Sequence, residues 1–196
     1  SFYAGTFIDE VGNSVQQTTD AGYIITGTVS DDIFLLKTDG NGIEQWRQTF
    51  GGTGNDEGHS VQQTTDGGYI ITGHTYSFAA VGSDVYIIKT NANGIEQWNL
   101  ILPHNASWIS KSVQQTTDGG YIVTGMIASG SQSSGFVQDI FLIKINGSGI
   151  QQWFETFSFY AGTFIDEVGN SVQQTTDAGY IITGTVSDDI FLLKTD

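Results

Sequence analysis

The sequence contains no cysteine, a single proline and a single methionine among its 196 residues. Without cysteine, a disulfide framework, a thiol nucleophile and a Cys-based zinc site are all excluded. The scarcity of proline beside 26 glycines fits a chain with many tight turns and no polyproline linkers. No apolar run approaches the roughly 20 residues of a membrane-spanning helix, so we expect no membrane insertion.

Basic residues are also scarce, with 6 Lys and Arg against 21 Asp and Glu, for a net charge of −15. Nucleic acids and anionic membranes are bound through basic surfaces, so neither is an expected partner. Apolar mass is sufficient for a core, because 38% of the residues are hydrophobic and 12% are aromatic. The sequence is therefore that of a folded, acidic chain.

One phrase occurs four times, which is the strongest feature of the sequence. It reads SVQQTTDAGYIITG at 14–27, SVQQTTDGGYIITG at 60–73, SVQQTTDGGYIVTG at 112–125 and SVQQTTDAGYIITG at 171–184. Two further phrases recur between these copies, of the types DIFLLKT and GIEQW. The units are about 50 residues long, a period typical of propellers and solenoids.

A longer period lies above this one, because residues 1–39 and 158–196 are identical. The sequence divides into units 1–50, 51–102, 103–157 and 158–196, the last of which repeats the first and starts a second block of 157 residues. The chain stops before the GNGIEQW phrase that would complete the fourth unit. We expect it to be a section of a longer tandem array.

Each unit holds four short runs with strand chemistry, separated by turns rich in Gly, Asn and Asp. No helical periodicity is present. The pattern predicts an all-β fold of four-stranded antiparallel propeller-type blades in tandem, about 3.75 blades in this chain. A β-solenoid is the competing architecture. The links at 74–83 and 126–138 vary in length between units and are predicted to be exposed loops.

The segments DGGYIITG (66–73) and DVYIIKTNANGIEQW (84–98) resemble the secreted β-propeller repeats of bacterial and archaeal surface proteins. A looser resemblance exists to the tryptophan-docking repeat of quinoprotein propellers. Asp39, Gly42 and Trp46 follow its pattern with one residue fewer between Asp and Gly, and Asn91 and Asn146 replace the Asp in later units. The resemblance implies an extracellular or cell-surface, usually non-catalytic module. It supplies no site residues.

Large aromatic residues recur once per unit, and we interpret them as packing between blades. A stacking platform for sugars is the alternative interpretation of the Trp residues. The predicted inter-blade residues are Tyr23, Trp46, Tyr69, Trp98, Tyr121, Trp153 and Tyr180. Four lysines also recur, near Asp32, Asp84, Asp139 and Asp189, and predict repeated ion pairs.

No catalytic, metal or cofactor site is predicted. The turn TDGNG at 38–42 superficially resembles a calcium loop, but the equivalent turns TNANG and INGSG have lost the Asp. His59, His74 and His104 occupy different unit positions, so no metal cluster or catalytic triad follows from them. Sequons at Asn105 and Asn146 predict surface glycans.

We therefore expect a non-catalytic extracellular structural repeat protein that assembles by blade-to-blade packing, with copies of itself or adjacent repeats as partners. A filament, tube or surface sheath is one form of such an assembly. The alternative is a ligand-binding or glycan-binding propeller of the adhesin type, closed as a discrete ring. Its binding surface would be the two long loops, with Tyr76, Phe78 and Phe136 exposed.

Overall fold

A computed structural model describes residues 10–78, 82–103, 106–131, 135–159 and 166–196. Over these residues the chain forms fifteen β-strands and no helix. It follows that the described part of the chain has no helical segment capable of crossing a bilayer.

The strands form four antiparallel sheets, each built from strands that are consecutive in the chain. Sheet 1 contains β1 (Glu10–Gln17), β2 (Tyr23–Val29), β3 (Asp32–Thr38) and β4 (Glu44–Phe50). Sheet 2 contains β5 (Asp56–Gln63), β6 (Tyr69–Thr75), β7 (Asp84–Thr90) and β8 (Glu96–Leu102). Sheet 3 contains β9 (Ser107–Gln115), β10 (Tyr121–Ser131), β11 (Gly135–Ile145) and β12 (Gln151–Phe157). Sheet 4 contains β13 (Glu167–Gln174), β14 (Tyr180–Val186) and β15 (Asp189–Thr195).

The first hairpin of each sheet closes through a turn that needs a left-handed residue. Gly67 and Gly119 take φ angles of 80° and 79° there, and Ala21 and Ala178 take 65° and 69°. A left-handed conformation costs an alanine about 1–2 kcal/mol relative to a glycine. The replacement of DGG by DAG therefore leaves the turn geometry intact and places a small backbone strain in sheets 1 and 4.

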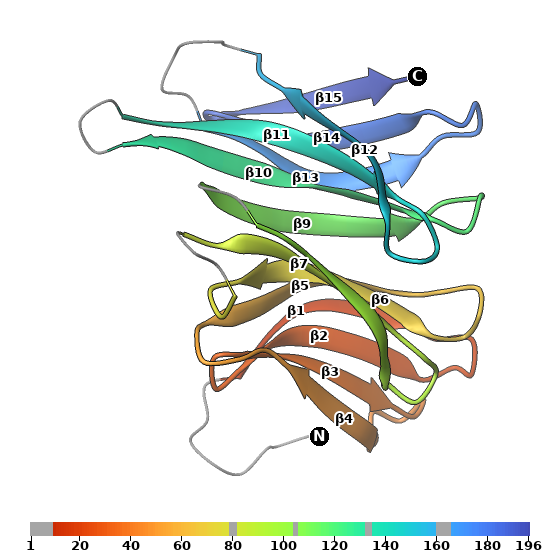
Figure 1. The fold of residues 1–196 in the computed structure, drawn as a ribbon. Coiled ribbons are helices and arrows are strands. Elements are labelled where there is room, and N and C mark those ends of the chain that lie inside the picture. Colours follow the sequence, from red (N-terminus) through yellow and green to blue (C-terminus); the bar gives the residue numbers. More distant parts are fainter. Residues whose placement is uncertain (1–9, 79–81, 104–105, 132–134, 160–165) are drawn as a thin grey trace.

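The four sheets are stacked in chain order, with sheets 1 and 4 at opposite ends (Figure 1). The hydrophobic core is divided into layers, one between each pair of neighbouring sheets. In the first layer Ile33 and Leu35 of sheet 1 pack against Tyr69 and Ile71 of sheet 2. The sheets do not close into a ring within the described residues. The predicted all-β class with antiparallel sheets in tandem is confirmed.

The two segments predicted to be loops differ in structure. The prediction is wrong for most of 126–138, because β10 and β11 continue through it and pair residue by residue from Ala128↔Gln138 to Ser131↔Gly135. Insertion there lengthens a hairpin instead of a loop, since an antiparallel ladder can grow symmetrically without disturbing the sheet below. Tyr76 and Phe78, in the other segment, are 46% and 50% exposed.

Candidate functional site

The SVQQ phrase lies on the first strand of each sheet and bonds one sheet to the next. The side-chain oxygen of Gln16 in sheet 1 accepts a hydrogen bond from the backbone N–H of Gln63 in sheet 2, at 2.6 Å. The same bond runs from Gln115 to Gln62 and from Gln174 to Gln114, again at 2.6 Å. A glutamine ladder therefore crosses all three interfaces.

Other residues of the phrase have hydrogen-bond partners that are equally constant. Ser14 Oγ accepts a hydrogen bond from the N–H of Val61 at 3.2 Å, and Gln63 Oε1 accepts one from the N–H of Thr19 at 2.9 Å. Equivalent bonds join sheets 2 and 3 and sheets 3 and 4. Because these side chains bond backbone groups of a neighbouring sheet, their identity must be repeated wherever two sheets meet. The repetition of the phrase is thus explained by contacts between sheets.

The predicted inter-blade aromatic residues meet in pairs across the same interfaces. The structure brings together a Trp from one sheet and a Tyr from the next, with ring centroids 5.7–5.8 Å apart; the pairs are Trp46–Tyr69, Trp98–Tyr121 and Trp153–Tyr180. Tyr69 and Tyr121 are only 2% exposed. Tyr23, at the same position of sheet 1, is half-buried and has no Trp beside it among the described residues.

A glycine covers one side of the Trp ring in two of these pairs. Gly94 and Gly149 adopt φ angles of 76° and 80°, and a Cβ at either position would lie 2.6–2.8 Å from the ring of Trp46 or Trp98. Both the backbone conformation and the close approach therefore require glycine. This contact favours packing over sugar stacking for these Trp residues, because one ring face is already covered.

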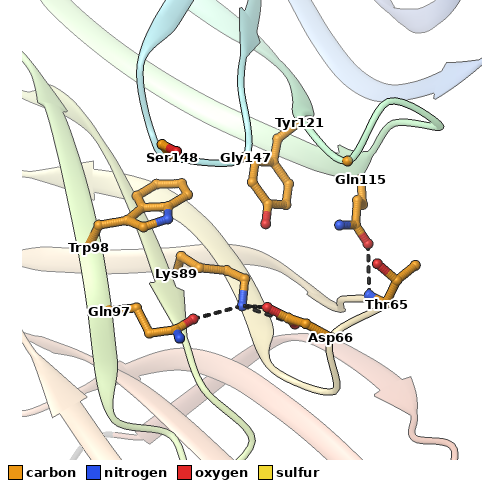
Figure 2. Close-up of a pocket in the computed structure, with 10 residues that line it drawn as sticks. Thr65, Asp66, Lys89, Gln97, Trp98, Gln115, Tyr121, Gly147 and Ser148 are labelled. Atoms are coloured by element: carbon orange, nitrogen blue, oxygen red, sulfur yellow. Dashed lines mark hydrogen bonds and ion pairs between the residues drawn. The ribbon is translucent and has the colours of Figure 1, made fainter.

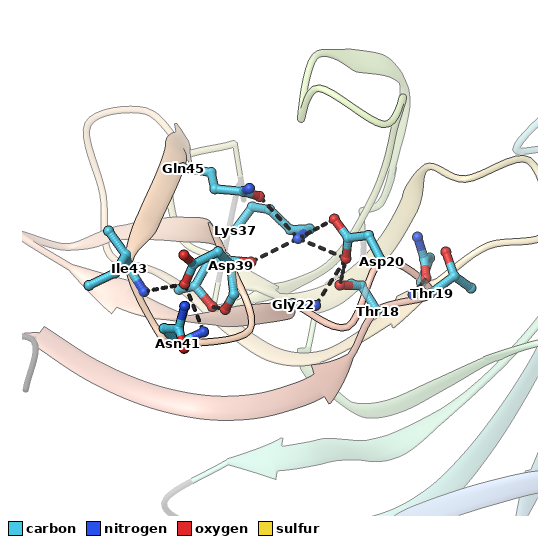
Figure 3. Close-up of polar contacts among 11 residues, drawn as sticks. Thr18, Thr19, Asp20, Gly22, Lys37, Asp39, Asn41, Ile43 and Gln45 are labelled. Carbon is cyan, nitrogen blue, oxygen red and sulfur yellow. Dashed lines mark hydrogen bonds and ion pairs between the residues drawn. The ribbon is translucent and has the colours of Figure 1, made fainter.

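The recurring lysines do form ion pairs, but the predicted partners are wrong. Lys37 bonds Asp20 at 2.8 Å, and Lys89, Lys144 and Lys194 bond Asp66, Asp118 and Asp177 at 2.9–3.0 Å. Asp32 starts β3 whereas Lys37 lies near its end, opposite Ile24 and next to the β1–β2 turn that carries Asp20 (Figure 3). The register of strand pairing therefore determines that each lysine pairs with the aspartate in the turn. Proximity in sequence does not reveal this register.

Each of these lysines except Lys194 is buried, with an exposed side-chain fraction of 3–4%. The Lys37 ammonium also donates to the carbonyl of Thr38 at 2.8 Å and to Gln45 Oε1 at 3.2 Å, so all three of its protons are used. The Thr116 hydroxyl and the Lys144 ammonium lower the pKa of Asp118 to about 2. In sheets 1 to 3 these pairs hold the two hairpins of the sheet together.

The turn that resembled a calcium loop is closed by its own first residue. Asp39 Oδ1 accepts hydrogen bonds from the N–H groups of Asn41 and Ile43, both at 2.8 Å (Figure 3). In sheets 2 and 3 Asn91 and Asn146 accept the equivalent bonds at 2.9–3.1 Å. One oxygen suffices for this role, which explains the exchange of Asp for Asn. Asn146 lies in this half-buried turn position, and Asn105 lies outside the described residues.

A groove of about 480 Å³ lies between sheets 2 and 3, beside one of the ion pairs. Figure 2 shows the indole of Trp98 and the hydroxyl of Tyr121 directed into it, above the Lys89–Asp66 pair. The charged groups of the groove bond each other, since Lys89 also donates to Gln97 at 3.1 Å. The groove is therefore part of the interface between the sheets.

The two ends of the stack expose surfaces that are buried elsewhere. We call the side of a sheet that faces the following sheet its forward face, and the opposite side its rear face. On the forward face of sheet 4, Ile190 and Leu192 are 88% and 71% exposed, whereas Ile33 and Leu35 at the same positions of sheet 1 are 0% exposed. On the rear face of sheet 1, Val15 is 65% exposed, whereas its equivalent Val172 is 3% exposed.

One further cluster was not anticipated from the sequence. Glu57, His59 and His74 each offer a ligand atom, and the three atoms lie within 4.8 Å of one another. Glu57 and His74 are directly opposite in the β5–β6 pairing, and the ladder shifts register between Gly58 and Ser60, at the position of His59. The different unit positions of the two histidines concealed the cluster. The β5–β6 pairing register was the signal that could have found it.

Comparison with known proteins finds a similar fold among solved structures and indicates no function. No protein-family model matches the sequence, and no curated protein matches it. A crystal structure of a protein of unknown function from Bacteroides caccae, at 1.35 Å resolution, matches with a TM-score of 0.55 and 13% sequence identity. The match covers 89% of this chain and 53% of that protein, so this chain corresponds to about half of its length.

Proposed function

We propose that the sheets are propeller-type blades and that the protein is a non-catalytic, extracellular structural repeat protein, which assembles by packing blade upon blade into an extended array. The observation that carries this proposal is the exposure of apolar residues on the forward face of sheet 4. Burying a side chain the size of Leu or Ile contributes about 1.5–3 kcal/mol. Ile190 and Leu192, at 88% and 71% exposure, leave most of that contribution unused.

The occupant of this face is a further unit of the same repeat. Residues 158–196 are identical to residues 1–39, so the forward face of sheet 4 has the side chains of the forward face of sheet 1. In the structure that face of sheet 1 is covered by sheet 2. A unit with the sequence 51–102 is therefore the partner that fits sheet 4.

The rear face of sheet 1 supports the same proposal from the other end. Gly42 has a φ of 80° and would have nothing within 4 Å of an added Cβ, whereas Gly94 and Gly149 at the same position contact a Trp of the preceding sheet. Tyr23 likewise has no Trp beside it among the described residues. A preceding unit with a Trp at the position of Trp153 would fill this place, as unit 103–157 does for sheet 4.

A longer chain tests the proposal directly. Residues 40–102 are repeated after Asp196, so that sheet 4 gains its fourth strand and a following unit. Amide hydrogen exchange in β15 is expected to slow to the rate seen in β3, and electron micrographs of multi-block chains are expected to show continuous arrays.

The matched control carries Ile190→Lys and Leu192→Lys in the longer chain, which should leave β15 exchanging faster than β3. Equal exchange of β15 in the 196-residue chain and in the longer chain would contradict the proposal. Closed rings in the micrographs would replace the extended array with a discrete propeller.

A further inference from the structure

We propose that Glu57, His59 and His74 form a binding site for one Zn²⁺ ion, with the three side chains as ligands and a fourth position open to water. Two imidazoles and a carboxylate are a known zinc ligand set, and three protein ligands leave one position of the tetrahedron open. The site lies on sheet 2, where β5 meets β6 and faces sheet 3.

The distances suit a tetrahedral ion. Ligand atoms at about 2.0–2.1 Å from zinc are separated by about 3.3 Å along a tetrahedral edge. Glu57 Oε2 and His59 Nε2 are 3.4 Å apart. The three ligand atoms lie within 4.8 Å of one another, so the third ligand is also near the position that such an ion would take.

The tautomer of His59 is set by a bond to sheet 3. Its Nδ1 lies 2.8 Å from the carbonyl oxygen of Ser110. In sheet 1 the residue at this position is Asn13, whose amide Nδ2 donates to the carbonyl of Gly58 at 2.9 Å. Because an amide nitrogen can only donate, the position is a donor position, and His59 carries its proton on Nδ1. In the neutral ring the Nε2 lone pair therefore faces Glu57, and the ring is held in place by a backbone carbonyl as metal-binding histidines commonly are.

His74 contributes a nitrogen that the described residues leave unused. The residue is 5% exposed, and its buried Nδ1 has no hydrogen-bond partner among the described residues. An unpaired buried polar atom costs about 1–3 kcal/mol, and a metal ligand bond would remove that cost. The Glu57 side chain is 36% exposed, so it gives an ion access from solvent.

The site occurs in sheet 2 and not at the same place in the sequence of the other units. Sheets 1 and 4 carry Val, Asn and Thr at the three positions, and sheet 3 carries Ile109, Lys111 and Met126. The residues of sheet 1 form the same strand pairing with the same bulge. Sheet 1 therefore supplies a substitution set that removes all three ligands and is already compatible with the fold.

The test uses the full chain and zinc chloride. Isothermal titration is expected to give one Zn²⁺ per chain and no comparable binding of Ca²⁺ or Mg²⁺, since these ions prefer all-oxygen sites. Cobalt(II) as a spectroscopic substitute should give the intense visible absorption of four-coordinate geometry. Zinc should also raise the melting temperature, because binding to the folded state alone stabilises it.

The triple variant Glu57→Val, His59→Asn, His74→Thr is the matched control. It should keep the circular dichroism spectrum of the parent and lose zinc binding, the cobalt absorption and the thermal shift. His59→Asn alone keeps the donor to Ser110 and should weaken zinc binding by at least about 100-fold, more than the loss of an outer-shell partner does. Lys111→Asn should tighten binding, because it removes a positive charge that acts on the site.

Two results would overturn the site. One is equal zinc stoichiometry and affinity in the parent and in a folded triple variant, which would assign the binding to the other acidic groups of the surface. The other is the absence of zinc binding and of any thermal shift in the parent. Neither result bears on the packing of sheet 4 against a further unit, which the exchange experiment measures separately.

Discussion

Leu35 and Leu192 provide a direct measure of what one sheet contributes by covering the next. The two residues lie at the same position of identical 39-residue segments. Leu35 is 0% exposed beneath sheet 2, and Leu192 is 71% exposed. We predict that Leu35→Ala lowers the free energy of unfolding by about 3 kcal/mol, within the range of roughly 2–5 kcal/mol for buried leucines. Leu192→Ala should cost less than about 1 kcal/mol, since less than a third of its side chain is buried.

Thermal unfolding followed by circular dichroism measures the difference. For a chain of this length 1 kcal/mol corresponds to about 2–4 °C, so the expected decreases are about 6–12 °C for Leu35→Ala and under about 4 °C for Leu192→Ala. In the chain extended by residues 40–102 after Asp196, Leu192→Ala should become as costly as Leu35→Ala. Equal effects of the two substitutions in the 196-residue chain would refute the reasoning, because identical segments would then be equally stable with and without a covering sheet.

Three further predictions follow from the contacts between and within sheets. Gln62→Leu leaves the N–H of Gln115 without its 2.6 Å acceptor and should cost about 1–3 kcal/mol in urea unfolding, whereas Gln173→Leu, on the exposed forward face of sheet 4, should change the midpoint little. Gly149→Ala forces a Cβ to within 2.8 Å of the Trp98 ring at a φ of 80° and should lower the melting temperature by several degrees. Gly42→Ala meets nothing within 4 Å and should have only the cost of the left-handed backbone. Equal effects of the two substitutions would disprove the close contact. The pKa of Asp118 is about 2 in the folded chain against about 3.9 in the unfolded chain. The stabilisation from its ion pair with Lys144 is therefore complete above about pH 4 and is lost as the pH falls toward about 2. Asp118→Asn should flatten this part of the stability profile measured by urea midpoints, and an unchanged acid slope would exclude the Lys144–Asp118 pair as its source.

The repeat and its strands could be predicted from the sequence because they depend on local patterns. Alternating β-branched and aromatic residues, with Gly, Asn and Asp between them, predict strands and turns without knowledge of distant contacts. The Trp and Tyr positions could be predicted for a similar reason, since a large ring recurring once per unit has few other uses. The structure places Trp46, Trp98 and Trp153 against the next sheet's Tyr.

The contacts that the sequence did not reveal depend on register. Lys37 was predicted to bond Asp32, which is nearer in sequence, yet the antiparallel pairing of β2 and β3 brings it to Asp20. The glutamine ladder was missed because Gln16 and Gln63 meet only when two sheets are stacked. Glu57, His59 and His74 were missed because the hairpin register, combined with the bulge at His59, determines which side chains share a face.

The identity of the end segments has a consequence for how such chains can change in length. The contact between sheets 3 and 4 is the contact that any added block of 157 residues would make with the block before it, because sheet 4 repeats the sequence of sheet 1. In-frame gain or loss of whole blocks during gene recombination therefore creates no interface between sheets that differs from those already present in this chain. Deleting one unit instead would place the forward face of one sheet against a rear face that it does not contact in this chain. Natural variants should therefore differ by complete blocks of three sheets.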